Sequence, residues 1–293
     1  MGRKPITQVF PFLLPIRKAQ RKCFFYLKML LDKNHYAKTQ AVEHLPFCAY
    51  SSSTSLYNSH TGFDMKYQEN KVFNLRLAAQ PVSGILIRPQ ETFSFWQLVK
   101  KADQRRYRDG LSVEYGKLTT VKGGGLCHLS NFLFWMFLHT PLTIIERHPH
   151  RVKDFPSPDA SEPDSVDATV SEGWLDLKVR NGTDLTFQVD LRFSDGCLNG
   201  WIFTDQPMPG RYEIVNRDKL FFRQQGKIFE QVSICRQEFD KQTGDIRSQQ
   251  LLYTDVFEIG YPLPEDTQVA MKEEDRNEEK NSGGFIWRLL NRI

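Results

Sequence analysis

The sequence predicts an α+β fold, in which a mainly helical first half is followed by a largely antiparallel β-rich second half. Apolar residues recur at helical spacing in 17–36 and in 70–84. From residue 166 onward, short segments instead alternate apolar and polar residues between turns. A third segment, 126–139, has no polar face in its second half, which predicts a helix buried at the centre of the fold. The predicted fold is therefore a central helix, headed by a Gly-rich turn and a cysteine, packed on a largely antiparallel sheet.

In the first half of the chain, a separate sequence pattern predicts each helix and strand. In 17–36 the apolar residues lie opposite Lys and Arg, which is typical of an amphipathic helix. The segment 45–68 is rich in Ser, Thr, Tyr and Asn and predicts short strands or loops, whereas 70–84 predicts a helix that ends near its Pro and Gly. A short strand, a turn at Pro89 and a helix capped by Ser94 should follow.

The second half begins beyond the buried helix. Residues 141–155 predict a strand that carries His148 and His150 and ends in a polar turn. "RNGTD" and "FSDGCLNG" have the composition of hairpin turns. Further strands are predicted in "VDATV", "WLDLKVRN", "LTFQVDLRFSDG", "LNGWIF", "RYEIVNRDKLFF" and "YTDVFEIGY".

Composition divides the chain into three parts. Residues 1–44 form a basic, helical N-terminal segment, and 45–264 form the α+β domain. Residues 265–293 are acidic and polar and end in a short amphipathic stretch, so this tail is expected to be disordered.

Charge and hydropathy limit the partners and the location. The net charge of +4 is modest, and Lys and Arg are interspersed with acids, so no nucleic-acid partner is expected. The N-terminal apolar stretch is too short to span a bilayer, is interrupted by Pro11 and Pro15, and lacks a signal-peptide pattern. We therefore expect a cytoplasmic or peripheral membrane protein. The basic segment has two readings: a helix docked on the body, or peripheral contact with a membrane surface.

The 5 cysteines are widely spaced, odd in number and contain no CxxC pair. This pattern predicts reduced thiols rather than a disulfide scaffold or a zinc ribbon. The segment "GGGLCH" also lacks the GK[ST] of a phosphate-binding loop and the CxxCH of haem attachment. No cofactor is expected.

Cys127 is the most reactive candidate. It lies at the predicted N-terminus of the buried helix, where the helix dipole and unpaired amides favour a thiolate. The preceding glycines, among them Gly124 and Gly125, permit close approach of a substrate and offer amides to an oxyanion. Two other interpretations stay open. Cys127 can be a small buried residue after a turn, or a zinc ligand together with His128, His148 and His150.

A nucleophilic cysteine needs a base, and "ERHPHRV" offers His148 and His150. A cysteine at the head of a buried helix, with a histidine on a following strand, is the arrangement of papain-like and transglutaminase-like enzymes. Asp167 or Asp154 would then orient the imidazole. Pro149 disturbs the shared face of the two histidines.

Four segments together resemble a known family: "NKVFNLRLAA", "RPQETFSFWQLV", "GKLTTVKGGGLCHLSNFLFWMFLHTPLTIIERHPHRVKDFP" and "VDATVSEGWLDLKVRN". They resemble the VanW family, which is named for an accessory protein of glycopeptide (vancomycin) resistance clusters. The resemblance extends from "ITQVFPFLLPIRKAQ" through "GWIF" at 203.

The resemblance implies chemistry, since some VanW-domain relatives are understood to be cysteine-dependent peptidoglycan transpeptidases. It implies that Cys127 attacks a stem-peptide carbonyl, with His150 as the matching histidine and Asp167 as the D-A-T aspartate. Arg147 would bind a substrate carboxylate. The family usually has Gln directly after the cysteine, where this chain has His128. The predicted substrate-binding set is Arg147, Gly124, Gly125, His128 and Ser94.

Three functions are compatible with these features. The first is a cysteine acyltransferase (L,D-transpeptidase-like) or peptidase acting on peptidoglycan stem peptides or their precursors. The second is a protein that binds such a precursor without chemistry. The third is a scaffold of a resistance cluster that docks on other cell-wall enzymes.

Overall fold

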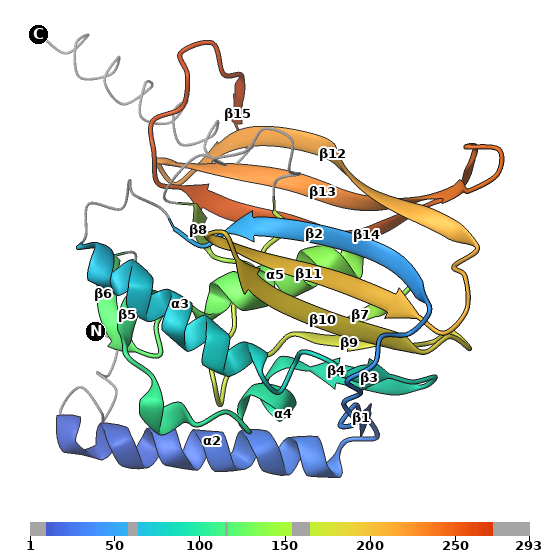
Figure 1. The fold of residues 1–293 in the computed structure, drawn as a ribbon. Coiled ribbons are helices and arrows are strands. Elements are labelled where there is room, and N and C mark those ends of the chain that lie inside the picture. The colour runs from blue at the N-terminus through green and yellow to red at the C-terminus, as the bar shows by residue number, and fades with distance from the viewer. Residues whose placement is uncertain (1–9, 58–63, 115–116, 154–164, 272–293) are drawn as a thin grey trace, which may run out of the picture. The chain divides into compact units, whose positions relative to one another are not determined.

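The computed structural model describes residues 10–57, 64–114, 117–153 and 165–271 (Figure 1). The chain folds into two compact units. The first comprises Met1–His148 with Asp167–Pro209, and the second Pro149–Val166 with Gly210–Ile293. Most of the predicted disordered tail, 272–293, lies outside the described residues. The division into 1–44, 45–264 and 265–293 stays a prediction.

The first unit contains the four α-helices of the described chain and two 4-stranded sheets. The helices, with two short 3-10 turns, are α2 (Leu14–Leu31), α3 (Met65–Ala79), α4 (Phe95–Val99), α5 (Leu126–Leu138), η1 (Pro11–Leu13) and η2 (Gln104–Arg106). One sheet has the order β1-β4-β9-β7, from His35–Tyr36, Glu91–Ser94, Lys178–Arg180 and Thr143–Glu146. The other has the order β2-β11-β10-β3, from Phe47–Ser55, Cys197–Thr204, Phe187–Ser194 and Leu86–Ile87. β5 (Asp109–Glu114) and β6 (Lys117–Lys122) form a hairpin.

The second unit is built on a 5-stranded sheet of order β15-β12-β13-β14-β8. Its long strands β12, β13 and β14 are mutually antiparallel, whereas β8 and β15 pair in parallel at the two edges. The bounds are Val152–Lys153 for β8, Gly210–Gln224 for β12, Lys227–Asp240 for β13, Ile246–Ile259 for β14 and Val269–Met271 for β15.

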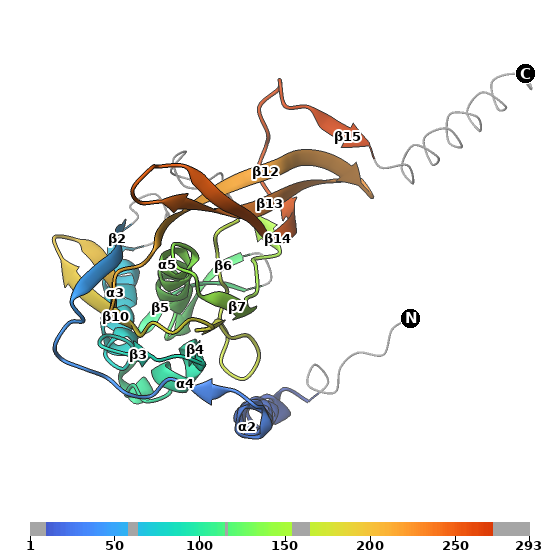
Figure 2. The same ribbon diagram turned by 90° about the vertical axis from the view of Figure 1, so that its right-hand side faces the viewer.

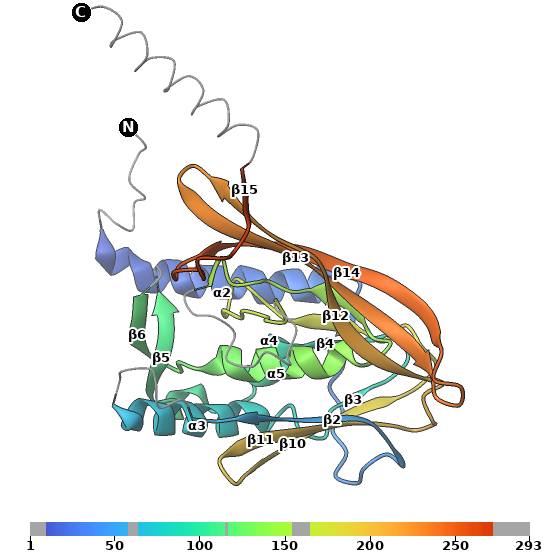
Figure 3. The same cartoon turned by 90° about the horizontal axis from the view of Figure 1, so that it is seen from above.

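The predicted α+β class and the mostly antiparallel pairing are confirmed. α5 runs between the two sheets of the first unit (Figures 2 and 3). On one side, the ring of Phe137 lies 4.9 Å from that of Phe93 in β4. On the other side, Gly200 in β11 admits the helix, since a Cβ there would lie 2.4 Å from the sulfur of Met136. The buried central helix was therefore predicted correctly.

Ser94 caps α4 as predicted, because its hydroxyl accepts a hydrogen bond from the Gln97 amide. The predicted hairpin turn forms within "FSDGCLNG", where Asp195 and Gly196 both take positive φ and β11 begins at Cys197. "RNGTD" does not form a hairpin: it joins β9 to β10, which belong to different sheets. The side chain of Asn181 instead holds this turn by donating to the carbonyls of Ile87 and Leu185.

Two strand predictions differ from the described fold. β7 ends at Glu146, so the prediction that a strand carries His148 and His150 is wrong. Pro149 lacks an amide hydrogen and therefore cannot continue a β-ladder through 148–150. "VDATV" is not a strand either, and it lies along α5. β13, in contrast, was not predicted.

None of the helices in the described residues combines the length and the apolar character that crossing a bilayer requires.

Candidate functional site

The glycine turn before α5 has a backbone that other residues would not fit. Gly123 and Gly125 have φ values of 78° and 96°, in the left-handed region. Gly124 meets the β5–β6 hairpin so closely that a Cβ would lie 2.2 Å from the carbonyl oxygen of Gly110. The Asn74 side chain fixes this approach by donating to the carbonyls of Arg108 and Gly124, at 2.9 and 3.1 Å. The turn therefore sets where α5 begins.

Cys127 occupies the first turn of α5, as predicted, and is half-buried. Its Sγ donates a weak hydrogen bond to the carbonyl of Val170 at 3.7 Å. The Gly124 amide is used inside the turn, where it donates to Val121. Among the described residues, no acceptor pairs with the amides of Gly125, Leu126 or Cys127. The thiol therefore stands beside free donors at the positive end of the helix dipole.

The segment 167–170 lies along the beginning of α5. The hydroxyl of Ser130 donates to the carbonyl of Ala168 at 2.6 Å, and the side-chain oxygen of Asn131 accepts from the Ala168 amide at 2.8 Å. The amide of Thr169 donates to the carbonyl of His148 at 2.7 Å. The predicted "D-A-T" motif is thus placed beside the thiol by α5 side chains rather than by strand pairing.

Arg147 is bonded to the same segment. Its Nε donates to the backbone carbonyl of Asp167 at 2.5 Å, and its Nη2 donates to Oδ1 of that residue at 2.8 Å. Only 4% of the Arg147 side chain is exposed, and its guanidinium lies 5.4 Å from the Phe134 ring centroid. In this conformation Arg147 positions Asp167, and its role toward a substrate carboxylate stays a prediction.

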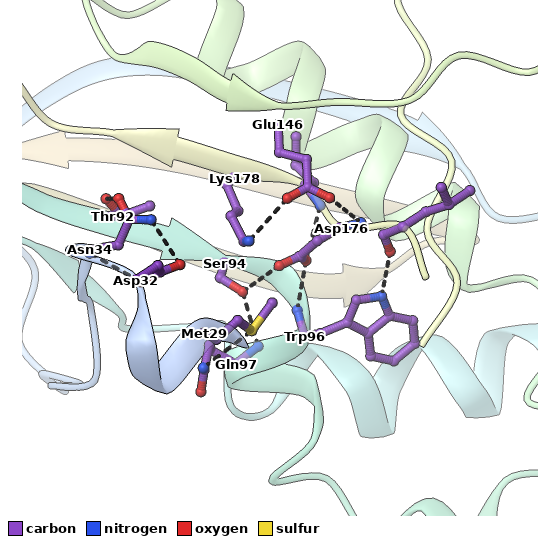
Figure 4. Close-up of polar contacts among 12 residues, drawn as sticks. Met29, Asp32, Asn34, Thr92, Ser94, Trp96, Gln97, Glu146, Asp176 and Lys178 are labelled. Carbon is purple, nitrogen blue, oxygen red and sulfur yellow. Dashed lines mark hydrogen bonds and ion pairs between the residues drawn. The ribbon is translucent and has the colours of Figure 1, made fainter. Parts of the chain in front are cut away.

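Ser94 belongs to a polar network with Glu146, Asp176 and Lys178 at the β1-β4-β9-β7 sheet (Figure 4). His148 joins this network from beyond the end of β7. Nε2 of His148 lies 3.0 Å from Glu146, which also pairs with Lys178 at 2.9 Å. The buried hydroxyl of Ser94 donates to Asp176 at 2.6 Å. Burial raises the pKa of Asp176 to about 6, although the hydrogen bond from Ser94 opposes this shift. Ser94 is thus used inside the fold, and its assignment to the substrate-binding set stays a prediction.

A second polar group, formed by Lys71 and His128, lies at the start of α5, and the sequence did not predict the part played by Lys71. Lys71 of α3 packs on Gly125, where a Cβ would lie 2.3 Å from its Cγ. Burial lowers the pKa of Lys71 to about 8, and none of the described acids forms an ion pair with it. The neighbouring His128 contacts Thr54 through Nε2 at 3.3 Å. A Lys in a predicted helix resembles a solvated surface charge, so only the fold reveals this position.

Burial, followed by the charge of Lys71, lowers the pKa of His128 to about 4. The imidazole is therefore neutral at pH 7 and can donate or accept a hydrogen bond without carrying a charge. The predicted substrate-binding residues Gly124, Gly125 and His128 all surround the start of α5.

Lys71→Met should raise the pKa of His128 above its value of about 4, yet keep it below the ordinary 6.5. At the pH where His128 titrates, Lys71 is protonated, so removing its charge relieves repulsion of the imidazolium while burial remains. Histidine NMR titration measures the shift. Lys66→Met, at an exposed position of the same helix, is the control and should leave the titration unchanged. An unchanged His128 titration in Lys71→Met would contradict the contact.

His150 is exposed and belongs to the second unit, whereas Cys127, Arg147 and Asp167 belong to the first. The structure thus gathers Cys127, His128, Gly124, Gly125 and the 167–170 segment within one unit. The pairing of His150 with Cys127, and its orientation by Asp167, stay predictions. The alternative acid Asp154 lies outside the described residues. Within the described ranges, no cluster of three or more His, Cys, Asp or Glu side chains is arranged to hold a metal ion.

Comparison with known proteins relates this site to one family. A family model described as "VanW like protein" matches residues 70–203, which include the glycine turn, Cys127 and the 167–170 segment. The chain is 51% identical over 270 residues to the vancomycin B-type resistance protein VanW of Enterococcus faecalis, covering 92% of this chain and 98% of that protein.

A second relative is more distant. The uncharacterized protein YoaR of Bacillus subtilis is 28% identical over 130 residues, which cover 44% of this chain and 41% of that protein. No solved structure matches the fold. The identity and coverage of the enterococcal relative show that the chain belongs to the VanW family.

Proposed function

We propose that this protein is a cysteine-dependent acyltransferase, or a peptidase, that acts on peptidoglycan stem peptides or their precursors in glycopeptide resistance. The observation that carries the proposal is the Cys127 thiol in the first turn of a buried helix, next to the unpaired amides of 125–127. The vancomycin resistance named for the enterococcal relative supports the biological setting.

The reaction begins with attack of the Cys127 thiolate on a stem-peptide carbonyl. A C–S bond forms, the carbonyl oxygen becomes an oxyanion, and the tetrahedral intermediate collapses as the C–N bond breaks. The base that removed the thiol proton returns it to the leaving amine, and a thioester remains on Sγ. An amine from a second stem peptide then completes a transfer, whereas water completes a hydrolysis.

The head of α5 supplies the electrostatic part of this reaction. The amides of Gly125 and Cys127 lie at the positive end of the helix, have no acceptor among the described residues, and are suited to bind the oxyanion. His128 takes the place of the family Gln as a neutral hydrogen-bonding group, because its pKa is about 4. Gly124 does not donate to the oxyanion, since its amide already donates to Val121. Its contribution is the absence of a side chain, which allows the tight turn before α5.

Two groups qualify as the base in this proposal. His150, oriented by Asp167, matches the family motif. Lys71 belongs to the same unit as the thiol, and a pKa of about 8 leaves part of its amine neutral near physiological pH. Arg147 holds Asp167 and, through it, the segment whose Val170 carbonyl accepts from the thiol.

Intact-protein mass spectrometry with a stem-peptide donor tests the proposal. The expected result is a mass increase equal to the donor acyl group, which maps to Cys127 after digestion and disappears on treatment with hydroxylamine. The absence of an adduct, combined with alkylation of Cys127 at the rate of an ordinary thiol, would refute the acyl-enzyme.

A non-catalytic precursor-binding protein or scaffold is the second candidate. A pocket of about 620 Å³ favours the binding form, because the cations of Lys66, Arg108 and Lys122 in its lining outnumber Asp109. Such a pocket suits the carboxylates of a stem peptide. In this case Cys127→Ser would preserve both precursor affinity and resistance.

A further inference from the structure

We propose that the outer face of α2 binds the surface of an anionic membrane, with the helix axis parallel to the bilayer. The inference is independent of the chemistry at Cys127. It concerns a helix that runs along one side of the first unit (Figures 1 and 2). Figure 3 shows the same helix along the edge of that unit.

α2 exposes large apolar side chains that a helix packed on a domain would normally bury. The exposed fraction is 78% for Leu30, 77% for Leu31 and 64% for Ile16. Phe24 is 60% exposed, and Phe12 in the preceding turn is 71% exposed. Contiguous exposed apolar side chains of this kind mark an interaction surface.

The spacing of these residues defines one face. Ile16, Leu27 and Leu31 follow the spacing of i, i+11 and i+15, which at 3.6 residues a turn returns to the same side of a helix. Phe24 and Leu30 flank this stripe. We call the set of Ile16, Phe24, Leu27, Leu30 and Leu31 the outer face.

The opposite side of α2 is the one that packs on the first unit. The sulfur of Met29, 3% exposed, accepts from the Gln97 side chain at 3.3 Å. The hydroxyl of Tyr26 donates to Glu172 at 2.8 Å, and Lys22 pairs with the same carboxylate at 2.7 Å. Docking on the body and an exposed outer face therefore coexist, so the two readings of the basic segment are not exclusive.

The charge of α2 favours an anionic membrane as the partner of the outer face. α2 contains no acidic residue, and its basic residues are Arg17, Lys18, Arg21, Lys22 and Lys28. Arg17, Arg21 and Lys28 share a line beside the outer face, by the same helical spacing. The guanidinium of Arg21 lies 4.2 Å from the ring of Trp174, which is itself 60% exposed. An apolar face bordered by cations and an indole suits the headgroup region of an anionic bilayer.

Co-sedimentation of the full chain with vesicles tests this inference. The protein should sediment with phosphatidylcholine vesicles that contain about one third phosphatidylglycerol, and much less with pure phosphatidylcholine. Raising the salt concentration should weaken the binding, because the electrostatic part is screened. The double variant Leu30→Ser and Leu31→Ser should lower the partition coefficient by about tenfold or more.

The matched control is Ile246→Ser with Leu251→Ser, which removes two exposed apolar side chains from β14 of the second unit. This variant should sediment like the wild type, and so should Cys127→Ser. Equal losses in the α2 and β14 variants would overturn the proposal, as would wild-type protein that stays in the supernatant with anionic vesicles. A vesicle-independent dimer that dissociates in the α2 variant would assign the face to a second copy instead.

Discussion

Cys127→Ser should abolish acyl transfer, with a fall in turnover of about a thousandfold or more, because a serine hydroxyl at this position lacks the nucleophilicity of a thiolate. The acyl adduct should disappear from the mass spectrum at the same time. The fold should persist, since the only described hydrogen bond of the thiol is the weak one to Val170, which a hydroxyl can replace. Steady-state turnover and circular dichroism measure the two effects.

Cys197→Ser is the matched control for this experiment. Cys197 is a free cysteine of the same intermediate burial, but on β11 its side chain lies on the opposite face from the buried Leu198 and from Gly200, which admits α5. Its substitution should leave turnover and resistance near the wild-type level. If cells carrying Cys127→Ser kept full vancomycin resistance, the catalytic proposal would fail and the precursor-binding alternative would stand.

Gly124→Ala should destabilise the first unit by about 3 kcal/mol or more, since the new methyl group overlaps backbone rather than a movable side chain. Its Cβ would lie 2.2 Å from the carbonyl oxygen of Gly110 and 2.9 Å from that of Leu111. Relief requires the β5–β6 hairpin to move away from the start of α5. Chemical denaturation measures the loss in the free energy of unfolding.

Gly182→Ala supplies the control, because no atom lies within 4 Å of a Cβ at that position and its φ is not in the left-handed region. There the substitution should be neutral or slightly stabilising, by about 0.4–1 kcal/mol, through the lower entropy of the unfolded chain. Equal stability of the two variants would show that the close approach of Gly124 is relaxed in solution.

Much of the local structure could be predicted from the sequence, because it depends on short-range chemistry. An apolar run after three glycines was enough to predict α5 with Cys127 in its first turn. Ser94 as an N-cap follows from the placement of its hydroxyl before an apolar helix. The Asp-Gly pair of the β10–β11 hairpin follows from its tolerance of positive φ.

The parts that failed depend on distant contacts. The alternation of apolar and polar residues in 167–170 predicts a strand. In the structure, the segment instead forms hydrogen bonds with α5 side chains such as Asn131. The sequence pattern predicts Lys71 as a surface charge. Because Gly125 has no Cβ, the Lys71 side chain instead packs against it and lies near His128. The hydrogen bonds that Arg147 and Ser94 make to Asp167 and Asp176 were also hidden, because these partners are distant in sequence.

The order in which the ribosome synthesises the chain determines when the thiol gains its neighbours. Val170, which accepts from Cys127, lies 43 residues further along the chain, and β11 follows later still. A nascent chain therefore exposes Cys127 on the ribosome well before it has the segment that accompanies the thiol. Until β11 has been synthesised, α5 cannot pack against it at Gly200, and the helix that carries Cys127 lacks one of its two covering sheets.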